Sequence, residues 1–336
     1  MTDATDLHRD ALVIDTHTHP AHFTPEPARS LYRLVNRGTM PPEEPYDELP
    51  AGSVDVVVAK AVGDAVVTRW YRGGAWAAVA RQLDRAVAQV GGRVVADAGS
   101  LRAVAPGNGR PVAVLGVEGA DALGDDVDNV DRWHERGVRV VGLVHLADNQ
   151  FGTTCMPWQH YVGPLPVRRR VTTGLSALGA RVVDRMQSVG ILVDLAHADR
   201  ETTLSVIDRV TRPVIVTHSG ARARQDFARF LADDEIQAVA ATGGAVGLWP
   251  YCHRGRGVRD VDDLVGHARH VADLVGPQHL CLGTDLNGVP GLMNGYRGEG
   301  DLPLVTSALI EDGFTESELR GILGGNALRV FDGATG

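Results

Sequence analysis

The 336-residue sequence contains only three cysteines, and they follow no recognisable pattern. Cys155, Cys252 and Cys281 are odd in number and lack Cys-x-x-Cys spacing. A disulfide framework and a zinc ribbon both require paired cysteines, so neither is expected. This use of cysteine is typical of a protein in the reducing cytoplasm.

The sequence also lacks long apolar runs and an excess of positive charge. It has no stretch of about 18 apolar residues, and the polar start, Met1 to Asp10, has no apolar segment of the kind found in signal peptides. We therefore expect neither a membrane span nor a signal peptide. The formal net charge of −9 disfavours nucleic acid as a partner, because such binding depends on many phosphate contacts.

The sequence does have the composition of an ordinary globular protein. Hydrophobic residues make up 44% of the chain and charged residues 22%, and the mean hydropathy is −0.07. This composition supports a large core. The length would allow two average domains, but parallel barrels with long loops often reach this size as one domain. We expect one catalytic domain over residues 1–336.

Eight apolar runs predict β-strands. Most consist almost entirely of Val, Ile, Leu and Ala, which is typical of parallel strands that are buried on both faces. The runs are Leu12–Thr16, Val54–Ala61, Val112–Val117, Val138–Val144, Ile191–Leu195, Val214–Thr217, Ala245–Leu248 and Leu280–Gly283.

Segments with helical spacing of apolar residues lie between these runs. They are Ala75–Val90, Gly179–Ser188, Glu201–Arg209, Asp234–Ala241 and Val261–Val275. The alternation of strand and helix predicts an α/β fold, a closed (β/α)₈ barrel of the TIM type, with a doubly wound open sheet as the alternative. The barrel is favoured because polar residues follow several different strands, which is where barrels place their chemistry.

Three further segments have a predicted structure. Residues 21–51 are rich in Pro and Glu without clear periodicity, and we expect an excursion near the barrel mouth that forms part of a substrate lid. Residues 149–173 form a second long loop. Near the end of the chain, Thr315-x-x-Glu318 predicts a capping box, and the helix that it opens is expected to end at Gly324-Gly325.

The candidate metal ligands follow directly on the apolar runs. His17 and His19 form a His-x-His at the end of the first run, and alternate residues of an extended segment point to the same side, so both can bind one metal ion. A polar pair without metal is the alternative for these two alone. Later runs end in Glu118, His145, His197, His218 and Asp285. So many imidazoles and carboxylates at equivalent positions are costly to bury unless they bind a metal.

The residue types indicate separate roles. Glu118 has two oxygens and lies between two histidine groups, which suits a carboxylate that bridges two metals, although a helix-capping role is the alternative. His197 and His218 lie one strand–helix repeat apart and would bind a second metal. Asp285 is the candidate general base and acid, with loop capping as the alternative. His145 is either a polar core residue or a group that stabilises an oxyanion.

Together with these candidate ligands, the sequence resembles the membrane (renal) dipeptidase family of the amidohydrolase superfamily. The resemblance extends from about Leu12 to Phe331. It is carried by Val13-Ile14-Asp15-Thr16-His17, Gly116-Val117-Glu118-Gly119, Leu143-Val144-His145-Leu146-Ala147-Asp148-Asn149, Gly174-Leu175-Ser176-x-x-Gly179, Leu192-Val193-Asp194-Leu195-Ala196-His197, Pro213-Val214-Ile215-Val216-Thr217-His218-Ser219, Gly283-Thr284-Asp285 and Gly324-Gly325-Asn326-x-x-Arg329-Val330-Phe331.

The resemblance implies a zinc metallo-dipeptidase with two Zn²⁺ ions per chain. One ion would be bound by His17 and His19, the other by His197 and His218, with Glu118 and a hydroxide as bridges. In the family that hydroxide attacks the amide bond of small dipeptides, L,D-dipeptides included. Asp285 would match the proton-transfer carboxylate and His145 the histidine that contacts the substrate. The family also often forms homodimers.

The resemblance further implies an arginine that holds the substrate carboxylate. Arg229 is the best match, and Arg222 is the nearby competitor. This sequence departs from the family pattern at His19, where His-x-Asp is common, and at Arg229-Phe230, where Arg-Asn is familiar. The first departure makes the metal site one charge more positive and bears on the choice of metal.

Two other function classes compete with a dipeptidase. A Tat-D-like metal-dependent deoxyribonuclease shares the order His-x-His, Glu, His, His, Asp, but the acidic net charge, His145 and Gly324-Gly325-Asn326 oppose it. A non-catalytic scaffold in a biosynthetic pathway would be expected to have lost ligands, and none is clearly lost.

Overall fold

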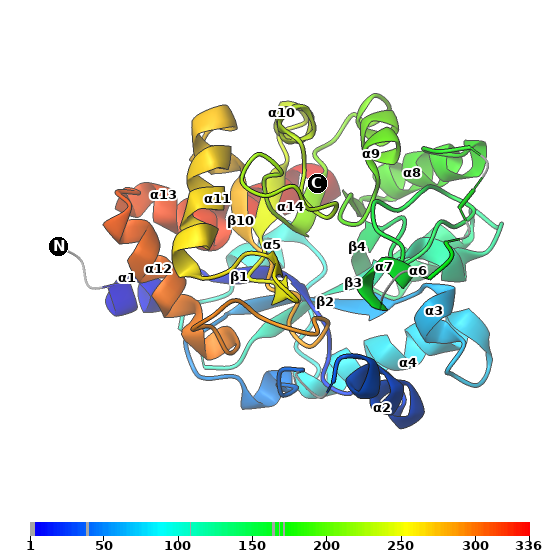
Figure 1. The fold of residues 1–336 in the computed structure, drawn as a ribbon, viewed down its shortest axis with the longest axis horizontal. Helices are drawn as coiled ribbons and strands as arrows, with labels where there is room; N and C mark the ends of the chain where they lie inside the picture. The colour runs from blue at the N-terminus through cyan, green and yellow to red at the C-terminus, as the bar shows by residue number, and fades with distance from the viewer. Residues whose placement is uncertain (1–3, 38–39, 108, 163–164, 168, 171) are drawn as a thin grey trace.

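A closed barrel of parallel strands forms the centre of the fold (Figure 1). The structure, a computed structural model, describes residues 4–37, 40–107, 109–162, 165–167, 169–170 and 172–336. Within these residues eight strands pair in parallel in the order β1-β10-β7-β6-β5-β4-β3-β2 and close on themselves. They are β1 (Ile14–Thr18), β2 (Val56–Val62), β3 (Val112–Glu118), β4 (Val138–Gly142), β5 (Leu192–Asp194), β6 (Ile215–Ser219), β7 (Ala245–Leu248) and β10 (Leu280–Leu282). The predicted barrel is confirmed.

The strands are buried on both faces because their sequences are apolar almost throughout. In β2, Val57 and Ala59 belong to an outer apolar cluster that packs against the helices, whereas Val56 and Val58 belong to an inner cluster. This alternation follows from the two-residue period of a strand. Residues of α14 (Asn326–Thr335) join the inner cluster, so this helix covers the end of the barrel where the strands begin.

Helices surround the barrel, and the five predicted ones are confirmed. They are α4 (Gly74–Gln89), α8 (Ala177–Val189), α9 (Arg200–Ile207), α10 (Asp233–Ala241) and α11 (Val261–Val275). Other helices are α1 (Ala4–Asp10), α3 (Ala65–Thr68), α5 (Ala98–Arg102), α6 (Asn129–Glu135) and α12 (Leu302–Glu311). The short strands β8 (Cys252–His253) and β9 (Arg256–Gly257) form a hairpin. None of the helices in the described ranges is both long enough and apolar enough to cross a membrane.

The two predicted long loops are more regular than their sequences suggest. Residues 21–51 contain the helix α2 (Glu26–Val35), which was not predicted and has no fully buried residue. The predicted position is confirmed, because much of this segment lines the cavity at the barrel mouth. Residues 149–173 contain the short helix α7 (Gln159–Val162). Residues 38–39, 163–164, 168 and 171 of these loops lie outside the described residues.

The predicted capping box near the end of the chain is confirmed, but the predicted helix end is wrong. Thr315 and Glu318 bond to each other's backbone N–H groups and start α13 (Glu316–Arg320). The chain then continues through a π-helical turn, Gly321–Gly325, into α14. A Cβ on Gly324 would lie 2.2 Å from the carbonyl oxygen of Leu12, so the glycine allows close packing against the barrel rather than a helix end.

His267 on α11 is a buried histidine that the fold keeps neutral. Its Nδ1 accepts a hydrogen bond from the backbone N–H of Ala221 at 3.0 Å, and burial lowers its pKa from 6.5 to about 4. In the unfolded chain His267 is therefore protonated as the pH falls below 6.5, whereas in the folded protein it is protonated only near pH 4. The contribution of His267 to stability is thus constant above pH 7 and falls as the pH drops from 6.5 to 4.

Replacing His267 with Gln tests this linkage. The Gln oxygen can accept the same hydrogen bond without titrating, so His267→Gln should lose about 2 kcal/mol less unfolding free energy between pH 7 and pH 5 than wild type. Urea titrations at both pH values, with chelator present throughout, measure the difference. Replacement of the exposed His160 by Gln is the matched control. Equal losses in wild type and His267→Gln would contradict the prediction.

Candidate metal centre and cavity

Seven polar side chains predicted from the sequence meet where the barrel strands end. Within the described residues none of these side chains is more than 12% exposed. The parallel barrel explains the meeting, because all its strands finish at the same rim. The seven are His17 and His19 from β1 and its end, Glu118 from β3, His145 after β4, His197 after β5, His218 from β6 and Asp285 after β10.

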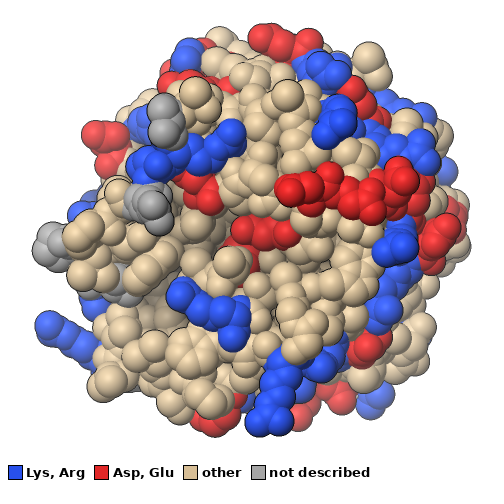
Figure 2. All heavy atoms as spheres, turned by 90° about the vertical axis from the view of Figure 1, so that its right-hand side faces the viewer, with Lys and Arg blue, Asp and Glu red and all other residues tan. Residues whose placement is uncertain are grey.

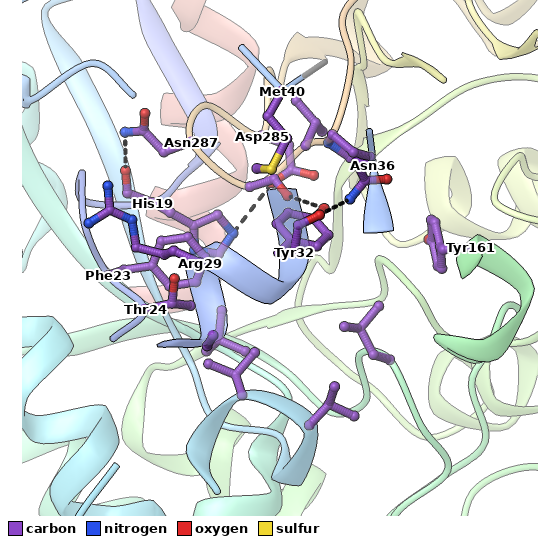
Figure 3. Close-up of a pocket in the computed structure, with 18 of the residues that line it drawn as sticks. His19, Phe23, Thr24, Arg29, Tyr32, Asn36, Met40, Tyr161, Asp285 and Asn287 are labelled. Atoms are coloured by element: carbon purple, nitrogen blue, oxygen red, sulfur yellow. Dashed lines mark hydrogen bonds and ion pairs between the residues drawn. The ribbon is translucent and has the colours of Figure 1, made fainter. Parts of the chain in front are cut away.

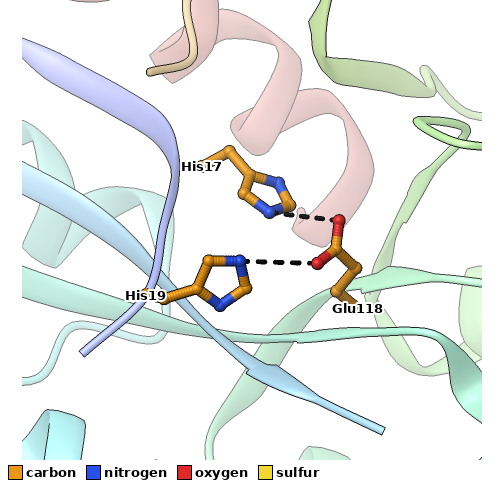
Figure 4. A group of neighbouring side chains, drawn as sticks. All are labelled: His17, His19 and Glu118. Carbon is orange, nitrogen blue, oxygen red and sulfur yellow. Dashed lines mark ion pairs between the residues drawn. The ribbon is translucent and has the colours of Figure 1, made fainter. Parts of the chain in front are cut away.

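Glu118 lies at the centre of this group. His17 Nε2 is 3.3 Å from Glu118 Oε1, and His19 Nε2 is 3.4 Å from Oε2 (Figure 4). Figure 4 shows both imidazoles directed at the two oxygens of one carboxylate. The two histidines of the His-x-His therefore reach a common point, as their spacing predicts.

The other histidines approach Glu118 from the ends of β4, β5 and β6. His197 Nε2 is 3.1 Å from Glu118 Oε1 and 3.1 Å from His218 Nε2. His218 Nε2 is itself 3.8 Å from Oε1, and His145 Nε2 is 3.4 Å from Oε2. The ligand atoms of Glu118, His145 and His197 all lie within 4.8 Å of one another, so His145 is also close enough to contribute to a metal site.

The unpaired atoms of this cluster fit a divalent cation. Within the described residues His17 Nε2, Glu118 Oε1 and His197 Nδ1 are buried without a hydrogen-bond partner. The facing Nε2 atoms of His197 and His218 can share at most one proton. Imidazole nitrogen and carboxylate oxygen in a buried group are the ligands that zinc takes in proteins.

The charges within the cluster are strongly coupled. Burial would raise the pKa of Glu118, but His145, His17 and His197 lower it well below its usual range. Burial, together with Arg229 and neighbouring histidines, lowers the pKa of His197 and His218 well below 6.5. Glu118 is therefore an anion, and these two imidazoles are neutral and offer lone pairs.

Asp285 lies beside the cluster and faces the cavity. Its Oδ1 is 3.3 Å from His19 Nε2, and its backbone N–H donates to the carbonyl of His17 at 2.8 Å. Asp285 has a φ of 59° and His197 a φ of 67°. Residues other than glycine rarely adopt this left-handed backbone conformation. Such strain collects at functional sites, where the surrounding structure compensates for it.

His145 is held by Asp64, a residue that the sequence reasoning missed. The Asp64 carboxylate accepts from His145 Nδ1 and also from the backbone N–H groups of Val66 and Val67, where it caps α3. Burial would lower the pKa of His145, but Glu118 and Asp64 raise it. Asp64 follows the second strand, so a search for polar residues after every apolar run would have found it.

Arg229, rather than Arg222, contacts the histidine cluster. Its Nη2 donates to His218 Nε2 at 2.7 Å, and its guanidinium lies 4.8 Å from the centre of the Trp249 ring. Only 3% of Arg229 is exposed. Arg222 is less buried, and its Nη2 bonds to the carbonyl of Ala228 on its own loop at 3.4 Å.

A cavity of about 640 Å³ opens above the cluster. His19, Glu118, His145, His197 and Asp285 of the cluster line its base. Figure 3 shows Phe23 and Tyr32 from the segment around α2 on one side and Tyr161 on the other. Its walls are mostly apolar and include Met40, Val62, Val66, Val67, Trp70, Trp158 and Tyr251. In the space-filling view of this side, a few charged groups border a hollow in a largely uncharged surface (Figure 2).

Comparisons with protein families and curated proteins give one consistent result. Residues 77–335 match the family model described as membrane dipeptidase (peptidase family M19). An uncharacterized dipeptidase of Schizosaccharomyces pombe is 30% identical over 229 residues, which are 67% of this chain and 53% of the relative. Dipeptidase aclJ of Aspergillus oryzae is 30% identical over 227 residues, 66% of this chain and 51% of the relative. The chain thus spans about half the length of these curated relatives.

Solved structures share the fold over the whole chain. The probable dipeptidase PvdM of Pseudomonas aeruginosa superposes with a TM-score of 0.78 at 18% identity, covering 99% of this chain and 97% of that one. A metallo peptidase of Rhodobacter sphaeroides, liganded with a phosphinate mimic of the dipeptide L-Ala-D-Ala, has a TM-score of 0.76 at 20% identity and covers 97% of this chain and 100% of that one. At these identities the similarity establishes the barrel fold.

Proposed function

Because this chain belongs to the membrane dipeptidase family, peptidase family M19, we propose that it is a zinc-dependent dipeptidase that hydrolyses the amide bond of small dipeptides, L,D-dipeptides included. The observation that carries the proposal is the ring of imidazole nitrogens around Glu118, next to Asp285 and at the base of a cavity. The relative liganded with a mimic of L-Ala-D-Ala supports the substrate class.

The proposal assigns the metal-binding residues in two pairs. His17 and His19 would hold one Zn²⁺, His197 and His218 would hold the other, and Glu118 would bridge them. When bound, two such cations polarise a carbonyl group and lower the pKa of water. Burial of the five ligands keeps bulk water away from these charges.

Asp285 and His145 supply the protein's own proton chemistry. The Asp285 carboxylate faces the cavity, where it can accept a proton from the attacking water and deliver it to the leaving amine nitrogen. Asp64 fixes His145 through Nδ1, so the opposite nitrogen, Nε2, points toward Glu118 and the cavity. A donor held in this way stabilises the negative charge that develops on the carbonyl oxygen.

The shape of the cavity suggests how the dipeptide lies. Arg229 is not itself a lining residue of the cavity, but it contacts Trp249 of the cavity wall, and from there it would bind the C-terminal carboxylate of the dipeptide. The first residue of the dipeptide would then point to the apolar walls around Phe23, Val67 and Trp70. Arg29 and Glu43 also line this part, but they pair with each other at 2.9 Å. We therefore propose that the first residue is preferably large and apolar.

A dipeptide panel tests the proposed function. Purified protein with zinc should release free amino acids from L,L- and L,D-dipeptides, and kcat/KM should be about tenfold higher when a small first side chain is replaced by a bulky apolar one. A chelator-treated sample is the control. If no dipeptide of the panel releases amino acids and the protein instead nicks DNA, the proposed dipeptidase function is wrong and the deoxyribonuclease alternative holds.

Replacing Arg229 tests its role separately. Arg229→Met should raise KM for dipeptides about 10-fold to 100-fold, since a charged hydrogen bond to the substrate carboxylate is lost. The same variant should process dipeptide amides, which lack that carboxylate, as wild type does. Arg222→Met is the matched control and should leave both substrates unaffected. An equal loss with dipeptides and their amides would contradict the assignment.

A further inference from the structure

Lys60 is the only lysine in the sequence, and the fold buries it completely. It follows Val56 and Val58 at alternate positions of β2, so it points into the barrel. Gly116 on the neighbouring β3 makes room for it, because a Cβ there would lie 2.6 Å from Lys60 Cδ. Burial of an ammonium group costs free energy unless the group is paired, so Lys60 is expected to have a buried partner of opposite charge.

The partner of Lys60 is Asp194, on β5 across the barrel. Lys60 Nζ lies 3.0 Å from Asp194 Oδ2, and neither side chain is more than 1% exposed. Asp194 Oδ1 accepts from the backbone N–H groups of Ala196 at 2.9 Å and Thr217 at 3.1 Å. Oδ2 also accepts from the Thr217 hydroxyl at 2.7 Å. Asp194 therefore acts purely as an acceptor.

The Thr217 hydroxyl links Asp194 to two histidines. A hydroxyl has one proton, and here it is donated to Asp194. Its oxygen must then accept from His17 Nδ1 at 2.7 Å and can accept from His218 Nδ1 at 3.1 Å. Both imidazoles thus carry their proton on Nδ1, and the Nε2 atoms that face Glu118 keep their lone pairs.

Lys60 also orients the second histidine of the His-x-His through its backbone. Its carbonyl oxygen accepts from His19 Nδ1 at 3.0 Å. A carbonyl cannot donate, so His19 also presents an unprotonated Nε2 in its neutral form. One residue is therefore linked to three of the four histidines that the proposed function assigns as ligands.

We propose that Lys60 is a positioning residue for the metal centre, whose ammonium acts through Asp194 and Thr217 to set the tautomers of His17 and His218 for binding a divalent cation. The proposal rests on the metal-binding part of the proposed function and not on the substrate. Hydrogen-bonding partners of metal-bound histidines typically change metal affinity 10-fold to 100-fold when they are removed.

Lys60→Met is the direct test. It should weaken binding of Zn²⁺ by about 10-fold to 100-fold, measured by competition with a chromophoric chelator, and alter the visible spectrum of bound Co²⁺. Val58→Ala, which opens a small cavity on the same face of the same strand, should lower stability and leave zinc affinity unchanged. A folded Lys60→Met protein with wild-type affinity and an unchanged Co²⁺ spectrum would overturn the proposal.

A double variant keeps the test valid if Lys60→Met fails to fold. Lys60→Met combined with Asp194→Asn removes both buried charges and should fold. The Asn amide can donate a hydrogen bond to the Thr217 oxygen, so the Thr217 hydroxyl no longer has to donate to position 194. Zinc affinity should then be as low as in Asp194→Asn alone. Wild-type affinity in the double variant would mean that Lys60 only balances a charge, and would overturn the proposal.

The single lysine also allows a spectroscopic check of the ion pair. Protein labelled with ¹⁵N only at lysine should give one side-chain ammonium signal, protected from exchange with water in wild type and less protected in Asp194→Asn. A rapidly exchanging signal from folded wild type would remove the basis of the proposal.

The binding measurements use no substrate. Zinc affinity that falls in Lys60→Met and not in Val58→Ala, in a protein that cleaves no dipeptide, would therefore refute the proposed function and support the role of Lys60. A protein that cleaves dipeptides but binds zinc equally well in wild type and Lys60→Met would do the opposite.

Discussion

Asp285→Asn is expected to lower kcat by about 10²-fold to 10⁴-fold while the metal content of the protein stays at the wild-type level. Asn has nearly the same shape but cannot take up the proton that the reaction releases. The carboxylate lies at the edge of the cluster, 3.3 Å from His19 Nε2, and faces the cavity, so its loss should affect chemistry more than metal binding.

Steady-state kinetics and metal analysis on the same preparation check this result. Asp332→Asn is a suitable control, because Asp332 is an exposed carboxylate that pairs with Arg102 away from the cavity. Retention of most of the activity in Asp285→Asn would show that another group carries the proton. Loss of metal together with activity would instead make Asp285 a ligand.

His19→Ala is expected to empty the metal site shared with His17 and to abolish activity, whereas His19→Asp should retain both. His19 is 2% exposed and reaches Glu118 Oε2 through Nε2 at 3.4 Å, so its removal leaves His17 as the only member of the His-x-His pair beside this carboxylate. A carboxylate at this position is also a good zinc ligand, so Asp can take the place of the imidazole.

Metal content by elemental analysis distinguishes these variants. His22→Ala is the matched control, since the His22 side chain is 50% exposed and pairs with Glu43 rather than with the cluster. Full metal content in His19→Ala would refute a ligand role for His19. Loss of metal in His19→Asp would mean that this chain has adapted its site to imidazole.

The barrel and the positions of the seven polar residues could be predicted because both depend on local patterns. A parallel strand buried on two faces must be apolar throughout, and its last residue must lie at the rim that all the strands share. His17, Glu118 and His218 could therefore be placed in one region before any contact was known. The helix α2 was missed although Ala28, Leu31, Tyr32 and Val35 recur at helical spacing, because the Pro and Glu residues around them indicate an irregular segment.

Which residue pairs with which histidine depends on contacts between different strands, and this pairing was not predictable from the sequence. Asp64 reaches His145 from a different strand, and Lys60 reaches Asp194 across the barrel interior. Lys60 lies in the middle of an apolar run, where sequence reasoning would treat it as an exception within a strand. Likewise, the sequence left Arg229 and Arg222 as alternatives, and only the fold of their loop puts Arg229 against His218.

The sequence by itself determined which polar residues meet at one end of a barrel, because strand period and strand direction are local properties. The tertiary structure decided which nitrogen of each histidine faces Glu118, which carboxylate holds His145, and which carboxylate pairs with the buried Lys60. These features arise from pairs of residues far apart in the chain, such as His17 with Thr217 and Lys60 with Asp194. Their geometry exists only after the barrel has closed.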